Sequence, residues 1–130
     1  MFDIYIICEE GFKNVSDGEE IIGFQFMARL PYHRGLGLSM VEQLYLKVDS
    51  EEVPRADIQV TLHGNTYTLD EMENEYRDRW EFGEKGIITV LKPGGLQPGI
   101  HRIELEPHMR ISYIPVTLTG KDAKELKLMV

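Results

Sequence analysis

Apolar and polar residues alternate along most of this chain, most clearly between residues 22 and 30. There, apolar side chains at every second position give the pattern of a β-strand with one buried face. The same period recurs elsewhere, so the chain is predicted to consist mainly of short strands. The alternating apolar positions are Phe2, Ile4, Ile6 and Cys8; Ile22, Phe24, Phe26, Ala28 and Leu30; Leu44, Leu46 and Val48; Ile58, Val60 and Leu62; Ile88 and Val90; Ile103 and Leu105; Met109, Ile111 and Tyr113; Leu126, Leu128 and Val130.

Turn residues separate these segments, as at Asp49-Ser50, Gly64-Asn65, 93–95, 98–99 and Gly120. Many short strands punctuated by Gly and Pro are typical of an antiparallel sandwich or barrel. We prefer the sandwich. No repeat, low-complexity tract or linker divides the chain, so 1–130 is predicted to be a single all-β domain, an antiparallel β-sandwich.

One segment has helical spacing instead. Leu69, Met72 and Tyr76 fall on one face of a helix, and Asp70 followed by Glu73 resembles a capping pair. This predicts one short helical connector of two turns at most.

Composition excludes several classes of function. The 130 residues carry 14 Lys+Arg against 22 Asp+Glu, a net charge of −8, which argues against nucleic-acid binding. The single cysteine excludes an internal disulfide, and no apolar run reaches the length of a membrane helix. The N-terminus has Asp3 where a signal peptide would be basic, so we expect a cytoplasmic protein.

The candidate chemistry of the remaining polar residues is weak. The four histidines, His33, His63, His101 and His108, lack metal-ligand spacing, so neither a metal nor another cofactor is predicted on this chain. Cys8 falls on an apolar face and is predicted to be a small buried hydrophobe.

Paired carboxylates could in principle supply a general acid and a base. Glu104 and Glu106 share one strand face, but with Arg102 they form a mixed-charge stripe typical of a solvated surface. Asp70, Glu71 and Glu73 crowd one turn in the same way. No catalytic residue is predicted.

The segment 29–40 is the most unusual in the chain. It follows the clearest strand and combines a proline, an aromatic residue, cations and apolar side chains. Loops with Tyr and Arg often carry binding function, so this one is predicted to bind substrate or a partner protein. The alternative is an ordinary crossover in which Leu36 and Leu38 are simply buried. The candidate binding residues are Pro31, Tyr32, His33, Arg34, Gly35 and Leu36, with Arg110 as a second candidate, although a residue in this position is more often a surface arginine than a ligand.

Several short motifs, spread over nearly the full chain, occur in the same order as in a known protein family. They are the opening FDxYIIC, GFQFxxRLPYHRGL at 23–36 with LSM at 38–40, YTLDEM at 67–72, RWEFG at 79–83, PGGLQPGIH at 93–101 and RISYIP at 110–115. On these motifs the sequence resembles the β subunits of bacterial C-glycoside deglycosidases, although His33 stands where that family's loop usually has a second tyrosine.

The resemblance implies a β-sandwich subunit paired with a larger α subunit, itself similar to sugar isomerase and epimerase TIM barrels. That partner would hold a divalent metal, typically manganese, in a hetero-oligomer of higher order. The implied substrates are 3-oxo-C-glycosides of flavonoids and related aromatics, whose sugar–aglycone C–C bond is broken by elimination. The complex would thus be a carbon–carbon lyase, and this chain alone would be inactive. The alternative from another class is a free-standing carbohydrate-binding β-sandwich module.

Overall fold

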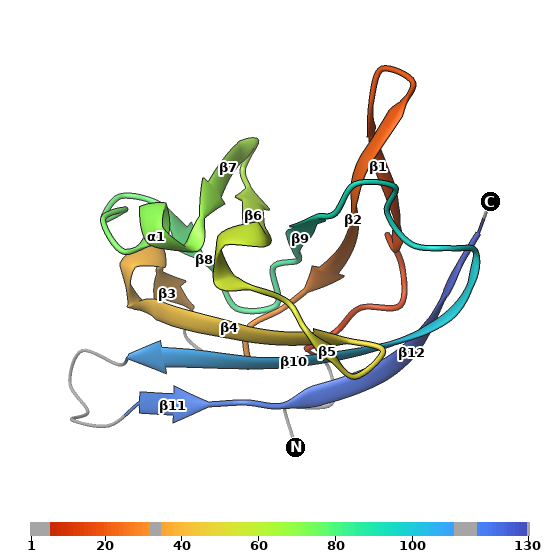
Figure 1. Cartoon of the computed structure of the whole chain (residues 1–130). Coiled ribbons are helices and arrows are strands. Elements are labelled where there is room, and N and C mark those ends of the chain that lie inside the picture. The colour runs from red at the N-terminus through yellow and green to blue at the C-terminus, as the bar shows by residue number, and fades with distance from the viewer. Residues whose placement is uncertain (1–5, 32–34, 111–116, 130) are drawn as a thin grey trace.

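Two antiparallel β-sheets lie face to face in the computed structural model, which describes residues 6–31, 35–110 and 117–129 (Figure 1). The first sheet has the order β1 (Lys13–Asp17), β2 (Glu20–Ala28), β9 (Gly86–Leu91), β6 (Ile58–Leu62) and β7 (Asn65–Thr68). The second has the order β11 (Thr117–Thr119), β10 (Gly99–Arg110), β4 (Val41–Val48) and β5 (Glu51–Glu52), with β12 (Asp122–Leu128) also paired to β10. The remaining elements are a ribbon of β3 (Leu36–Gly37) and β8 (Arg79–Trp80), helix α1 (Leu69–Met72), and 3₁₀ turns at Leu38–Met40 and Arg55–Asp57.

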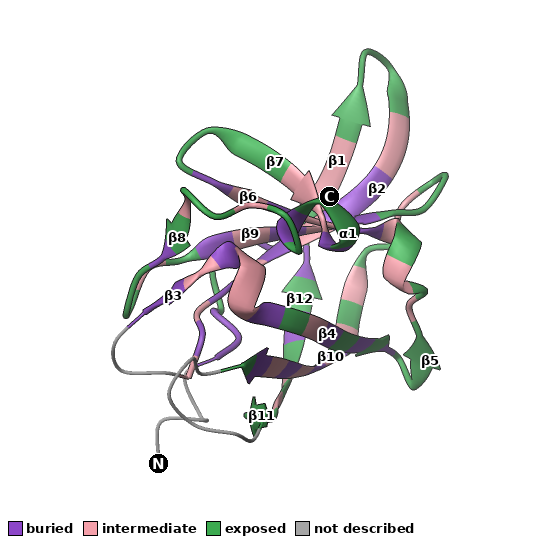
Figure 2. Cartoon of the chain, turned by 90° about the vertical axis from the view of Figure 1, so that its left-hand side faces the viewer, coloured by how far each residue is buried: buried purple, intermediate pink, exposed green. Residues whose placement is uncertain are grey.

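Residues that alternate between apolar and polar along the sequence lie alternately inside and outside the sandwich. Phe24, Phe26 and Ala28 of β2 and Ile88 and Val90 of β9 are all buried, and the residues between them are more exposed (Figure 2). Each sheet buries one face against the other, because removing apolar surface from water is the main force favouring the fold. The predicted all-β sandwich is confirmed.

Strand β10 is the longest strand of the described chain. It pairs with β4 along one edge and with β11 and β12 along the other. The sequence pattern separated Ile103 and Leu105 from Met109, but one continuous strand carries all three, with Pro107 inside it. The polar residues of β10, including Glu104 and Glu106, therefore face outward from the second sheet.

The N-terminal segment does not follow the predicted alternation. Residues 6–8 are all buried and make a single β-bridge, between Ile7 and Ala28. The backbone N–H of Ile7 donates to Asp122 at 2.9 Å, and Lys124 Nζ donates to the Ile7 carbonyl at 2.6 Å. Because the segment connects the end of β2 to β12, both of its sides are covered.

The predicted short helix is confirmed, but its predicted cap is wrong. Helix α1 spans only Leu69–Met72, so Tyr76 lies outside it. A capping box joins Thr68 and Glu71 in place of the Asp70–Glu73 pair, with the Glu71 N–H donating to Thr68 at 3.1 Å and the Thr68 N–H to Glu71 at 2.8 Å. Asp70 and Glu73 instead form ion pairs with Arg55 at 2.9 and 3.0 Å.

Two isoleucines on β10 test its orientation. Ile103 is fully buried whereas Ile100 is 68% exposed. We expect Ile103→Ala to lower the free energy of unfolding by about 2–5 kcal/mol, because it leaves a cavity, and Ile100→Ala to change it by no more than about 0.5 kcal/mol. Urea denaturation of both variants measures the difference. Equal effects would show that the strand faces are assigned incorrectly.

Candidate functional site

The predicted binding loop lies at one end of the sandwich, and the structure describes its two ends. Tyr32, His33 and Arg34 lie outside the described residues. Before them, Pro31 packs against Gly120 so closely that a Cβ there would lie 2.5 Å from the proline Cγ. After them, Gly35 is buried and has a φ of +72°, and a Cβ would lie 2.6 Å from a Glu81 carboxylate oxygen. Both ends of the loop are therefore fixed by close packing.

The returning part of the loop is held along residues 75–81. Leu36 pairs with Trp80 in the β3–β8 ribbon, the Leu38 N–H donates to the Asp78 carbonyl at 3.1 Å, and the Ser39 N–H donates to the Glu75 carbonyl at 3.2 Å. Leu36 and Leu38 are buried, which agrees with the interpretation of these two leucines as core residues. Gly35 and Leu36 thus serve to anchor the loop, and neither offers exposed contact surface.

Trp80 anchors the 75–81 segment to the hydrophobic core. Its side chain is fully buried, and its indole N–H donates to the Glu84 carbonyl at 2.8 Å. The ring fills the space beside Gly86, where a Cβ would approach it to 2.7 Å. Only glycine at position 86 lets the start of β9 pass this close to the indole.

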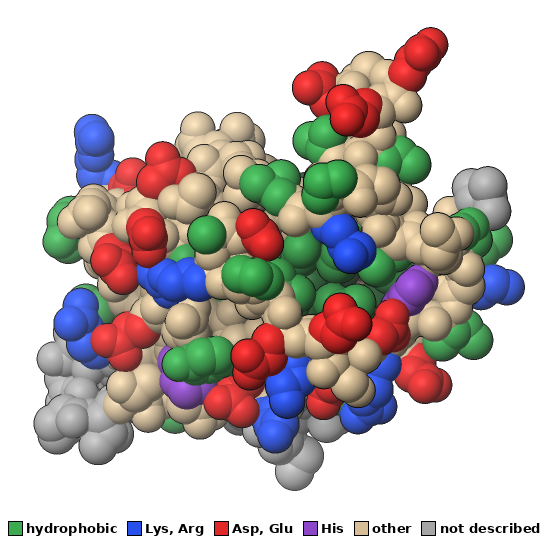
Figure 3. All heavy atoms as spheres, viewed as in Figure 1, with side chains coloured by type: hydrophobic (Ala, Val, Ile, Leu, Met, Phe, Trp, Pro, Cys, Tyr) green, Lys and Arg blue, Asp and Glu red, His purple; other side chains and the backbone are tan. Residues whose placement is uncertain are grey.

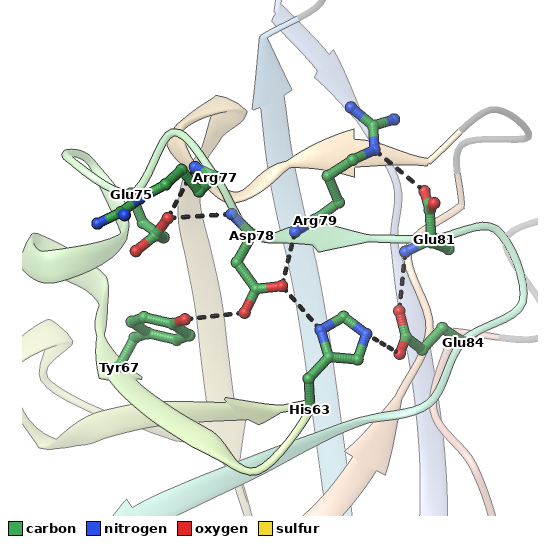
Figure 4. Close-up of polar contacts among 8 residues, drawn as sticks. All are labelled: His63, Tyr67, Glu75, Arg77, Asp78, Arg79, Glu81 and Glu84. Carbon is green, nitrogen blue, oxygen red and sulfur yellow. Dashed lines mark hydrogen bonds and ion pairs between the residues drawn. The ribbon is translucent and has the colours of Figure 1, made fainter.

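A cluster of polar side chains secures the same segment from the outer side (Figure 4). We call His63, Tyr67, Asp78 and Glu84 the Asp78 cluster. The Asp78 carboxylate accepts hydrogen bonds from the Tyr67 hydroxyl at 2.8 Å and the Arg79 backbone N–H at 2.9 Å. His63 lies between two carboxylates, with Nδ1 2.7 Å from Asp78 and Nε2 2.6 Å from Glu84. The cluster therefore ties the turn between β6 and β7 to residues 78–84.

The charges of the cluster match this geometry. The hydrogen bond to Asp78 raises the pKa of His63, so the imidazolium form, which donates from both nitrogens, is favoured. The same carboxylate raises the pKa of Tyr67 to about 12, which keeps the phenol protonated as a donor. Burial opposes the ionisation of Asp78, but hydrogen bonds from Tyr67 and His63 outweigh it and lower the pKa of Asp78.

The sequence pattern did not reveal this cluster. The sequence presents His63 only as a candidate metal ligand, and Asp78 is 15 residues away. The one local signal is the His63-Gly64 pair, which forms a hairpin turn with φ values of +53° and +80°.

Arg110 lies at the end of β10, where the chain returning from the loop enters β4. It is exposed and pairs with Thr117, and the adjacent Met109 pairs with Val41. The fold therefore brings Arg110 to the same end of the second sheet as the Gly35–Val41 part of the predicted loop.

The paired carboxylates of β10 form the expected mixed-charge surface. Glu106 lies 2.6 Å from His108 Nε2, and Glu104 lies 3.9 Å from Arg102. In the described ranges, no group of three or more His, Cys, Asp or Glu side chains is arranged to hold a metal ion. Cys8 is buried, and this burial raises the pKa of its thiol. No helix among the described residues is long and apolar enough to cross a membrane.

Comparison with known proteins identifies the family. The family model described as C-glycoside deglycosidase beta subunit matches residues 2–113. The chain belongs to the C-glycoside deglycosidase beta subunit family. It is 35% identical over 111 residues to the C-glycoside deglycosidase beta subunit of Eubacterium cellulosolvens, covering 85% of this chain and 76% of the relative. It is 33% identical over 95 residues to the 3'-dehydrocarminate deglycosidase beta subunit of a Microbacterium species, covering 72% and 70% of the two chains.

The matched region of this family member contains both the loop and its support. The loop, β3, the Asp78 cluster and all of β10 fall within residues 2–113, whereas β11 and β12 follow the match.

Removing His63 from the cluster tests its contribution to stability. Because folding raises the pKa of His63 above 6.5, its contribution is complete below pH 6.5 and is lost as the pH rises through the folded-state pKa. We expect His63→Asn to destabilise the protein more at about pH 5.5 than at about pH 8.5, in denaturation at both pH values. Asn tolerates the positive φ of this turn, so the backbone is preserved.

A second histidine, His101, makes the same pH-dependent contribution to stability in wild type and in His63→Asn. Its burial opposes protonation, but hydrogen bonds to Asp49 and to the Gln97 carbonyl outweigh this effect and raise its pKa as well. Because His101 is unchanged in the variant, its contribution to the free energy of unfolding cancels when wild type and His63→Asn are compared at each pH. A destabilisation by His63→Asn that did not change with pH would contradict the charged role of His63.

Proposed function

We propose that this chain is the small subunit of a heteromeric C-glycoside deglycosidase and works only with a larger α subunit. The match of a beta-subunit family model to residues 2–113 carries the proposal. The names of the relatives, which are themselves beta subunits, favour this function over a free-standing carbohydrate-binding module. The α subunit is proposed to be a TIM barrel similar to sugar isomerases and epimerases, in a cytoplasmic hetero-oligomer.

The proposed reaction is an elimination on a 3-oxo-C-glycoside, such as an oxidised flavonoid C-glucoside. The C3 ketone acidifies the C2 proton, a general base removes it, and the electron pair forms a C1–C2 double bond. The bond between C1 and the aglycone breaks, and the aglycone carbon takes up a proton. The relative named for 3'-dehydrocarminate supports a substrate of the 3-oxo type.

The divalent metal, proposed to be manganese, and the general base are assigned to the α subunit. When bound there, the metal would polarise the ketone oxygen. The described residues of this chain do not fit a metal, because no three suitable side chains come together. The two outer-face carboxylates of β10, Glu104 and Glu106, lie away from the anchored loop end of β4, since they pair with Lys47 and Tyr45 further along that strand.

The loop at Pro31–Leu36 is proposed to face the mouth of the partner's barrel. Tyr32 could cover an aglycone ring, and the guanidinium of Arg34 could donate to a sugar hydroxyl or the ketone oxygen. The close packing at Pro31 and Gly35 supports this role, because a loop fixed at both ends loses less conformational freedom on binding. Arg110 at the same sheet end would add a second cation.

Co-expression with a barrel protein from the adjacent gene tests the subunit role. We expect the purified chain alone to bind no stoichiometric manganese or zinc and to cleave no 3-oxo-C-glucoside, whereas the co-purified complex is active. Metal analysis and chromatographic detection of the free aglycone measure both properties. Activity of the lone chain with a bound metal would contradict the proposal.

Two loop substitutions separate substrate binding from subunit docking. If Arg34 and Tyr32 contact substrate, Arg34→Ala and Tyr32→Ala leave the complex intact but lower kcat/KM. If they anchor the partner, each weakens assembly by about 1–3 kcal/mol, as measured by titration of the two subunits. Lys13→Ala, which removes an exposed cation on β1 away from the loop, is the matched control and should change neither property. Normal assembly and normal kinetics in both loop variants would show that this loop is not the site.

A further inference from the structure

A hollow of about 390 Å³ lies on the outer face of the second sheet, away from the anchored loop. Its lining includes Tyr45, Lys47, Glu52, Glu104, Glu106 and Lys121. Figure 3 shows acidic and basic side chains interleaved along this lower part of the molecule. The volume falls within the range of sites for small ligands, about 300–1,000 Å³.

One wall of the hollow is held rigidly. Arg55, in the connector after β5, donates through Nη1 to the Gln43 side chain at 2.9 Å and to the Glu42 carbonyl at 3.0 Å. Its other nitrogens pair with Asp70 and Glu73, at 2.9 and 3.0 Å. These contacts fix the connector against β4, so this wall of the hollow is held by the chain's own side chains.

Tyr45 supplies an exposed aromatic ring that is held in place. The side chain is 53% exposed, and its ring meets the His108 imidazole at a centroid distance of 4.7 Å and an interplanar angle of 68°. His108 is in turn held by Glu106 at 2.6 Å. Because an exposed tyrosine would otherwise sample several rotamers, this support lowers the entropy lost when a ligand stacks on the ring.

The charged groups around the ring are available to a ligand. The side chains of Lys47, Glu52 and Lys121 make no hydrogen bond or ion pair within the described part of the chain. Among the same residues, the Glu104 side chain has only the distant Arg102, at 3.9 Å. The lining thus presents both donors and acceptors, with the carboxylates of Glu52, Glu104 and Glu106 beside the ammonium groups of Lys47 and Lys121.

These features select a neutral ligand with many hydroxyl groups. A phosphate or other anion would need an excess of basic groups, and the core of a protein–protein interface is normally depleted of Lys and Glu. A pyranose ring presents hydroxyls that both donate and accept, together with an apolar C–H face that can lie on an aromatic ring. We propose that the outer face of β4 and β10 binds the sugar ring of a glycoside on Tyr45, with Glu104 and Lys47 contacting its hydroxyls. This site goes beyond the proposed subunit role, because it lies on this chain alone.

Titration of the isolated chain with methyl β-glucopyranoside, followed by amide chemical shifts in NMR, tests the site. We expect saturable shifts confined to residues near 43–47 and 104–108, with a dissociation constant on the order of 1 mM. Tyr45→Ala should weaken binding by at least about tenfold, whereas Tyr45→Phe, which keeps the ring, should bind almost as well as wild type. Glu104→Gln should weaken binding because it removes a charged acceptor.

The matched control is Tyr76→Ala, which removes an aromatic side chain that is 77% exposed and lies outside the hollow. It should bind the sugar like wild type. No saturable shift, or equal binding in wild type and Tyr45→Ala, would overturn the proposal. Loss of α-subunit binding in Tyr45→Ala without any sugar binding would also overturn it, by identifying the face as a subunit contact. Because sugar binding and assembly are measured separately, failure of this site leaves the proposed subunit function intact.

Discussion

The attachment of residues 75–81 to the chain returning from the loop is the constraint on which the candidate site depends. This segment has little regular structure of its own, with only β8 inside it. Buried Trp80 holds it from the core and Asp78 holds it from the surface, through contacts with His63 and Tyr67. A partly buried carboxylate costs free energy unless its oxygens are hydrogen-bonded, and here both oxygens have donors. The result is a fixed backbone edge along which Leu36–Ser39 can pair.

The two proposed binding surfaces lie on different parts of the sandwich. Its end, where β4 begins and β10 finishes, presents the anchored loop and Arg110, which we assign to the partner and its substrate. The outer face of the second sheet presents Tyr45 among charges of both signs, which we assign to a sugar. An antiparallel sheet with one solvated face can carry such a surface without disturbing the core, because alternate residues point to opposite sides.

Sequence reasoning predicted the sandwich because the period of two survives wherever a strand is buried on only one face, as in β2 around Phe26. It failed at Ile6–Cys8, where both sides are covered, and at the helix cap, where Thr68 competes with Asp70. The family resemblance, carried by motifs such as those at 23–36 and 110–115, was confirmed. The Asp78 cluster and the hollow at Tyr45 could not be predicted, since both join residues that only the strand register brings together.

The central claim is that the loop held by residues 75–81 is the contact surface for a partner subunit. Hydrogen–deuterium exchange on the isolated chain and on the co-purified complex with the α subunit tests it most directly. The account predicts that peptides covering residues 29–40 and 75–81 gain protection in the complex, while those covering the β1–β2 turn do not. Protection confined to other surfaces, with exchange of 29–40 unchanged, would contradict it.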